Sequence, residues 1–137
     1  MNRLTKKLDE LKKQNKKALV AYLVAGDPDL DSTLDLMHMF VQSGVDVIEV
    51  GVPFTDPIAE GPIIQRAHDR AITKKTSLED IFKLITKFRL KDNVTPIVLM
   101  GYLNAFIFFR HLIEENKNNS VDSILVVDIP GELNIAD

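Results

Sequence analysis

Three carboxylates stand close together in one short stretch of this 137-residue chain. Glu49 lies within an apolar segment, and Asp56 and Glu60 follow in a loop rich in proline and glycine. Strand alternation would place Val45, Val47 and Glu49 on one face. A lone carboxylate on an apolar face is costly unless it is paired or neutralised. The stretch therefore predicts an active-site edge whose carboxylates move protons.

The composition is that of an ordinary globular protein, with 45% hydrophobic and 27% charged residues. The net charge is −3 and the pI is near 5.6, which disfavours nucleic acid and anionic membranes as partners. Because the chain has no cysteine, a disulfide, a thiol nucleophile and a cysteine metal site are excluded. No apolar run approaches the roughly 20 residues of a membrane span, and no secretory signal is visible. We expect a cytoplasmic protein.

Apolar runs of strand length alternate with helical patterns along the chain. The sequence predicts strands at 17–24, 45–50, 95–100 and 121–127, the third stopped by Gly101 and Tyr102. Helices are predicted at 3–14, 31–43, 63–73, 77–88 and 103–115. Asp31 or Ser32 would cap the start of the second helix, and Gly44 would follow its end. Pro62 would begin the third helix, and Ser77 with Asp80 would cap the start of the fourth.

The predicted strands are almost continuously apolar, which indicates a parallel sheet covered by helices. Two architectures remain, an open doubly wound sheet and a (β/α)8 barrel, and both place function at the carboxyl ends of the strands. Those ends carry polar or Gly/Pro-rich segments in this chain: 26–27, 49–60, 102–104 and Asp128. No Gly-x-Gly-x-x-Gly follows the first strand, which disfavours dinucleotide binding.

Four segments in the same order resemble the tryptophan synthase alpha chain family. They are LVAGDP at 23–28, IEVGVPFTDPIAEGPIIQ at 48–65, PIVLMGYLN at 96–104 and VDSILVVDIP at 121–130. Members of this family are TIM barrels of about 250 residues. The resemblance therefore implies an α/β fold of the parallel (β/α)8 type, here about half a barrel with four strands. Residues 1–137 are expected to form a single domain, the N-terminal half of the barrel, truncated after the fourth strand.

The resemblance also implies an activity. Family members are lyases that cleave indole-3-glycerol phosphate by a retro-aldol reaction into indole and glyceraldehyde 3-phosphate, in tryptophan biosynthesis. Position 49 carries their catalytic glutamate, and position 60 their second catalytic carboxylate, which interacts with the indole N–H. The reaction uses no metal or organic cofactor. The indole passes to the partner beta chain of an alpha2beta2 complex, and that chain holds the pyridoxal phosphate (PLP).

Other positions take their expected roles from the same resemblance. Those expected to bind substrate are Tyr22, Met100, Tyr102, Leu125, Val127 and Asp128. Those expected to contact the beta chain are Pro53, Asp56, Pro57 and Asn104. One departure concerns the chemistry, because the family has aspartate where this chain has Glu60. The added methylene displaces the carboxylate by over an ångström, and a misplacement on that scale costs about 100-fold in rate.

Two other interpretations stay open. The chain is a catalytically impaired remnant that acts only as a beta-chain-binding or structural module, or it is another phosphate-binding barrel enzyme such as an aldolase. The aldolase is disfavoured because none of the four strands ends in lysine. His38, His68 and His111 are interpreted as surface or core residues. The family's phosphate-holding loops lie in the second half of its barrel. A half-barrel leaves two strand edges unpaired, so we expect poor stability, self-association or dependence on a complementing half.

Overall fold

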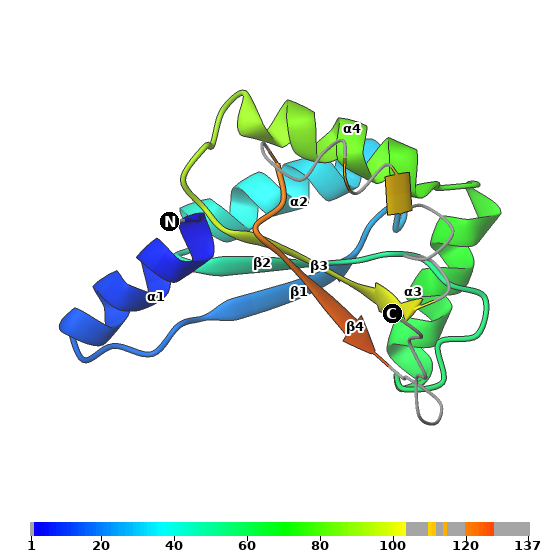
Figure 1. Cartoon of the computed structure of the whole chain (residues 1–137). Helices are drawn as coiled ribbons and strands as arrows, with labels where there is room; N and C mark the ends of the chain where they lie inside the picture. Colours follow the sequence, from blue (N-terminus) through cyan, green and yellow to red (C-terminus); the bar gives the residue numbers. More distant parts are fainter. Residues whose placement is uncertain (1, 104–109, 112–113, 115–119, 128–137) are drawn as a thin grey trace.

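The computed structural model describes residues 2–103, 110–111, 114 and 120–127. In chain order the elements are α1 (Arg3–Lys13), β1 (Val20–Val24), α2 (Leu30–Gln42), β2 (Val47–Gly51), α3 (Pro62–Thr73), α4 (Leu78–Arg89), β3 (Ile97–Tyr102) and β4 (Ser123–Val127). Figure 1 shows a sheet with α2 and α4 on one side, α1 near the start of the strands and α3 beyond their carboxyl ends.

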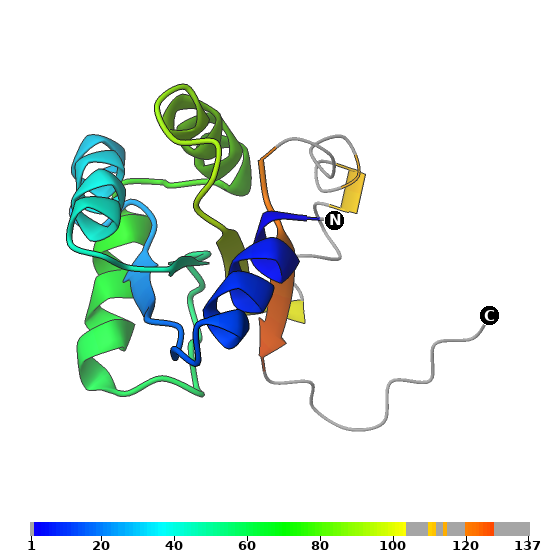
Figure 2. The same ribbon diagram turned by 90° about the vertical axis from the view of Figure 1, so that its left-hand side faces the viewer.

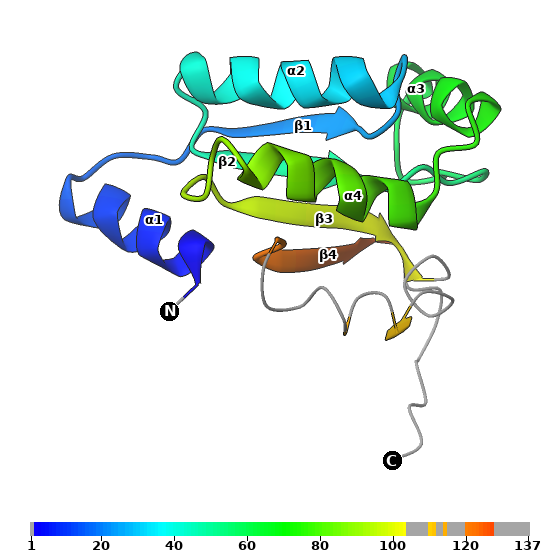
Figure 3. The ribbon, with the colours of Figure 1, turned by 90° about the horizontal axis from the view of Figure 1, so that it is seen from above.

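The four strands form one parallel sheet in the order β1-β2-β3-β4. A doubly wound sheet reverses its strand order and carries helices on both faces. Here the order never reverses within the described residues, and α2 and α4 lie side by side on the same face (Figure 3). This is the arrangement of half a (β/α)8 barrel, and it excludes the doubly wound alternative.

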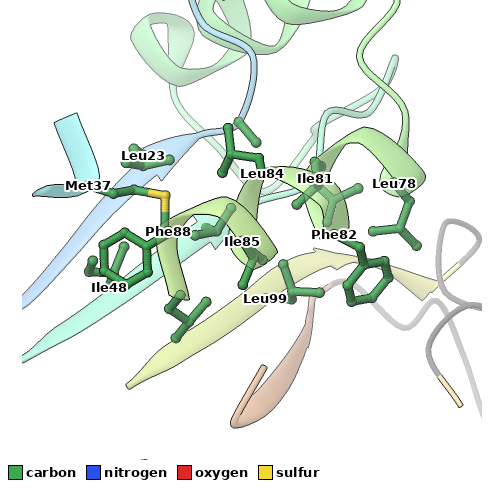
Figure 4. Close-up of a cluster of buried hydrophobic side chains, with 14 residues drawn as sticks. Leu23, Met37, Ile48, Leu78, Ile81, Phe82, Leu84, Ile85, Phe88 and Leu99 are labelled. Carbon is green, nitrogen blue, oxygen red and sulfur yellow. The ribbon is translucent and has the colours of Figure 1, made fainter. Parts of the chain in front are cut away.

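The main core lies between the sheet and the pair α2 and α4. Figure 4 shows Met37 of α2 and Phe88 of α4 against Leu23 and Ile48 of the first two strands. Phe88, Met37 and Ile48 are fully buried. The amphipathic pattern of α4 explains its position, because its buried residues recur at helical spacing along one side. The hydrophobic burial therefore fixes which face of the sheet points outward, toward the helices.

Helix α1 crosses the amino-terminal ends of the strands, as Figure 2 shows. Its attachment is ionic: the Asp122 carboxylate lies 3.2 Å from both Arg3 Nη1 and Arg89 Nη2, and it accepts the Ile97 backbone N–H at 2.9 Å. The Asp122 side chain is 1% exposed. Burial, with the nearby Arg3 charge, lowers the pKa of Arg89 to about 10. This cluster joins α1, α4, β3 and the start of β4.

Several local expectations need correction. Strand β3 does not stop at Gly101 and Tyr102 but includes both, because they pair with Val126 and Val127. The cap of α2 is Asp29, whose carboxylate accepts the Ser32 N–H, rather than Asp31 or Ser32.

Other local expectations are confirmed. Gly44 follows α2 with a φ of +90°, and Pro62 begins α3. Ser77 and Asp80 form the predicted capping box. The predicted helix at 103–115 falls mostly outside the described residues, and the single-domain boundaries stay a prediction. Among the described residues, no helix is long and apolar enough to cross a membrane.

Candidate active site

The face of the sheet opposite α2 and α4, here called the inner face, carries the side chains expected to do chemistry. The register pairs Tyr22 with Glu49 and Glu49 with Val98, so alternation assigns the rest of this face. Val47 shares it, whereas Val45 precedes β2 and packs against the outer core. The predicted site residues on the inner face are Tyr22, Glu49, Met100, Tyr102, Leu125 and Val127.

The loop between β2 and α3 brings Glu60 to the inner face. The Tyr102 hydroxyl donates to Glu60 Oε2 and accepts the Ala59 backbone N–H at 3.1 Å. The Phe54 ring stacks on Tyr102 with centroids 4.9 Å apart. Gln65 of α3 donates its side-chain amide to the Glu60 backbone carbonyl at 2.8 Å. The loop is therefore tied to β3 on one side and to α3 on the other, which fixes where the Glu60 carboxylate lies.

His68 of α3 is fully buried beside this carboxylate. Its Nδ1 accepts the Phe54 backbone N–H at 3.0 Å. Its Nε2 lies 3.5 Å from Glu60 Oε1 and 3.4 Å from the Tyr22 hydroxyl. One imidazole thus contacts the loop, the second carboxylate and the first strand.

Tyr22 crosses over β2 at a position that only glycine allows. A Cβ added to Gly51 would lie 2.3 Å from the Tyr22 hydroxyl oxygen and 2.8 Å from Cζ. Tyr22 also packs against a small cluster that contains Ala67 and Ala71 of α3. Burial raises the pKa of Tyr22, and the charges of Glu60 and Glu49 raise it further. The phenol therefore keeps its proton.

Glu49 is half-buried at the centre of the sheet, and burial raises the pKa of its carboxyl. Desolvation disfavours the charged form of a carboxyl group, so this group keeps its proton to a higher pH than an exposed glutamate does. The two predicted catalytic residues thus come from different elements: Glu49 from the strand, Glu60 from the loop. The charges of both carboxylates act on Tyr22, whereas their catalytic roles stay predictions.

The remaining predicted residues differ in their surroundings. Met100 is buried, Val127 is half-buried and Leu125 is 47% exposed on the edge strand β4. Of the predicted partner contacts, Asp56 is exposed, Pro53 is half-buried and Pro57 is buried. Asp128 and Asn104 lie outside the described residues. The roles assigned to all these residues stay predictions.

Sequence reasoning missed the site position of His68. It was correctly expected to be a surface or core residue, but nothing placed it against Glu60. Its one available signal was its position eight residues after Glu60, on the helix that ends the loop. In the described part of the chain, no group of three or more His, Asp or Glu residues is arranged to hold a metal ion.

Comparison with known proteins gives one consistent result. The sequence profile of the family "Tryptophan synthase alpha chain" matches residues 8–135. The Nitrosococcus oceani tryptophan synthase alpha chain is 46% identical over 134 residues, and the Legionella pneumophila (strain Corby) alpha chain is 44% identical over the same length. These matches cover 96% of this chain and 49% of each relative. The chain thus spans about half the length of the curated relatives it matches.

Solved structures agree with the sequence comparison. The crystal structure of the alpha subunit from Legionella pneumophila str. Paris is similar at a TM-score of 0.90 and 42% identity, covering 95% of this chain and 50% of that one. A mutant alpha subunit from Pyrococcus furiosus is similar at a TM-score of 0.75 and 43% sequence identity. That match covers 82% of this chain and 46% of the Pyrococcus chain. The order of motifs, the half-barrel and these matches together show that the chain belongs to the tryptophan synthase alpha chain family.

Proposed function

We propose that this chain provides the acid–base half of a tryptophan synthase alpha-type site, which cleaves indole-3-glycerol phosphate in tryptophan biosynthesis. The observation that supports the proposal best is that Glu49 and Glu60 come to one face from separate elements. Tyr22 pairs with Glu49 across the strands and approaches the same His68 nitrogen as Glu60 does. The apolar and aromatic side chains beside them, including Met100 and Tyr102, suit a flat indole ring.

The proposed steps conserve protons. The protonated carboxyl of Glu49 gives its proton to C3 of the indole ring, and the double bond shifts to leave a positive charge on the ring nitrogen. The Glu60 carboxylate accepts the N–H and stabilises that charge. The Glu49 carboxylate then takes the proton of the glycerol hydroxyl next to the ring, and the carbon–carbon bond breaks. Indole and glyceraldehyde 3-phosphate leave, and Glu49 is protonated again.

The raised pKa of Glu49 supports its place in the first step. A general acid works best when its pKa is near the operating pH, and burial shifts this carboxyl in that direction. No metal or organic cofactor enters these steps. We propose further that the product indole goes to a beta chain that holds PLP, and that the exposed Asp56 on the loop after β2 contacts that partner.

The test is an indole-release assay on a completed barrel. Residues 1–137 are joined to the second half of the Legionella alpha chain, which supplies the remaining strands, and indole is measured after addition of indole-3-glycerol phosphate. We expect indole release, and a loss of at least about 100-fold in Glu49→Gln, because general acid–base catalysis contributes that much. The matched control is Glu79→Gln, an exposed carboxylate on the outer helix α4. No indole from the unaltered barrel, or equal rates in the two variants, would refute the proposal.

The alternative, a module that only binds a beta chain, gives a different result in the same experiment. Addition of a beta-chain preparation would then raise the beta chain's serine-dependent activity with supplied indole. No indole would form from indole-3-glycerol phosphate. The edge strand β4 favours this alternative to a limited extent, because Leu125 and Ile124 are exposed there.

A further inference from the structure

We propose that His68 is a positioning residue that, together with Tyr102, fixes the position of the Glu60 carboxylate. This inference rests on the proposed function, because Glu60 is assigned there to the indole N–H. The juxtaposition behind it is a fully buried imidazole 3.5 Å from a carboxylate oxygen that has no hydrogen bond.

The two oxygens of Glu60 have different surroundings. Oε2 receives the Tyr102 hydroxyl. Oε1 is buried and has no hydrogen-bond partner among the described residues. The Glu60 side chain is 9% exposed, so bulk water does not compensate this oxygen. A buried carboxylate oxygen without a donor costs free energy, so it is expected to take one from a ligand or from a small movement of its neighbour.

The tautomer of His68 determines whether its Nε2 can donate a hydrogen bond to Oε1. Since Nδ1 accepts the Phe54 backbone N–H, the neutral ring carries its proton on Nε2. The Nε2 atom lies 3.4 Å from the Tyr22 hydroxyl oxygen and 3.5 Å from Glu60 Oε1. A shift of a few tenths of an ångström would bring either contact to ordinary hydrogen-bond length. The loop therefore orients the ring so that its one donor faces the carboxylate.

This chain has a particular reason to need such a contact. The family resemblance implies aspartate at position 60, and the glutamate of this chain adds one methylene and one rotatable bond. The longer side chain loses more rotamer freedom when it is fixed, and it reaches further. Two contacts on opposite oxygens, Tyr102 at Oε2 and His68 at Oε1, restrict it to one arrangement. His68 thus compensates for the longer side chain at position 60.

Two substitutions at His68 separate its contact with Glu60 from its contact with the loop. His68→Asn places an amide oxygen near Nδ1, so the loop N–H keeps its acceptor, but no donor reaches Glu60. His68→Gln places an amide N–H near Nε2, so the donor is kept. If His68 positions Glu60, Asn is the damaging change and Gln restores function. If His68 only anchors the loop, Asn is tolerated as well as Gln or better. If His68 only fills space, Asn is damaging whichever carboxylate stands at position 60, which the second measurement tests. His111→Asn, at an exposed position, is the matched control.

The first measurement uses the 137-residue chain itself and needs no activity. With ¹³C-labelled glutamate, we expect the Glu60 carboxyl resonance to move in His68→Asn and to stay close to the unaltered position in His68→Gln. The Glu60→Asp variant identifies the resonance by its disappearance. An equal shift in both His68 variants, or none in either, would overturn the positioning role even if the chain never releases indole.

The second measurement uses the completed barrel described above. We expect kcat for indole release to fall about tenfold in His68→Asn while KM changes little, because the indole nitrogen gains its charge only on the way to the transition state. His68→Gln should recover most of that loss. In a Glu60→Asp background the shorter carboxylate no longer reaches His68, so His68→Asn should then have little effect. A KM-only change, or the same loss in both backgrounds, would contradict the inference. An inactive unaltered barrel would refute the proposed function alone.

Discussion

Gly51→Ala tests whether the Tyr22 ring must lie directly over strand β2. The new Cβ would be 2.3 Å from the Tyr22 hydroxyl oxygen, whereas ordinary contact begins near 3.4 Å. The tip of the ring must therefore move by about 1 Å, the scale on which active-site geometry fails. Its movement is restricted, because the side chain also packs against a cluster that contains Ala67 and Ala71 of α3. Overpacking of this kind costs about 1–3 kcal/mol.

The assay is urea unfolding of the 137-residue chain, followed by circular dichroism, with the midpoint and slope compared between variants. We expect Gly51→Ala to lower the free energy of unfolding by about 2 kcal/mol. In a Tyr22→Leu background, which removes the ring tip, the same change should be neutral or stabilising by up to about 1 kcal/mol, because glycine weakens a strand. An equal cost in both backgrounds would refute the placement of Tyr22 over Gly51.

Three further predictions concern stability. Asp122→Asn should cost about 3 kcal/mol in urea unfolding, because it removes the carboxylate paired with the buried Arg89 guanidinium and leaves only the charge of Asp92 nearby. Asp9→Asn, on the exposed side of α1, should cost almost nothing, and similar costs for the two would contradict the ionic cluster. Ser77→Ala should cost about 1 kcal/mol through loss of the α4 capping box, and an unchanged midpoint would disprove its contribution. The third concerns Glu49, whose pKa is higher in the folded chain than in the unfolded chain. Its contribution to the free energy of unfolding is therefore complete below the unfolded pKa of 4.5, and it is lost as pH rises through the folded pKa. Glu49→Gln should therefore gain stability relative to the unaltered chain as pH rises from 4 to 8, and parallel pH profiles would show that burial does not shift this group.

The strands, the helices and the parallel sheet could be predicted because their determinants are local, whereas the half-barrel followed only from the family resemblance. Continuous apolar strands, Gly/Pro-rich ends and the Ser77 cap each act over a few residues, and the motif order supplied the family. The side-chain period of a strand then placed Glu49 and Tyr22 on one face without any long-range information. The doubly wound alternative could only be excluded by the strand order, which depends on contacts between distant segments.

The contacts that complete the site depend on such distant segments. Where His68 lies follows from the path of a loop across the strand ends, and no periodic pattern encodes that path. The cluster around Asp122 joins residues 119 positions apart, so no sequence spacing reveals it. The cap of α2 lies two or three residues before the expected position for a simpler reason: Asp29, Asp31 and Ser32 are all good caps, and only the backbone geometry selects among them.

The central claim is that Glu49 delivers a proton to C3 of an indole ring held on the inner face. Indole alone tests it, because the step needs no phosphate-binding residues. The chain is incubated with indole in D₂O at neutral pH, and loss of the C3 proton signal is followed by NMR; the chain contains no tryptophan that would add an indole signal. The account predicts exchange at C3 faster than in buffer, lost in Glu49→Gln and retained in Glu79→Gln. Exchange at the buffer rate, or exchange that survives Glu49→Gln, would contradict it.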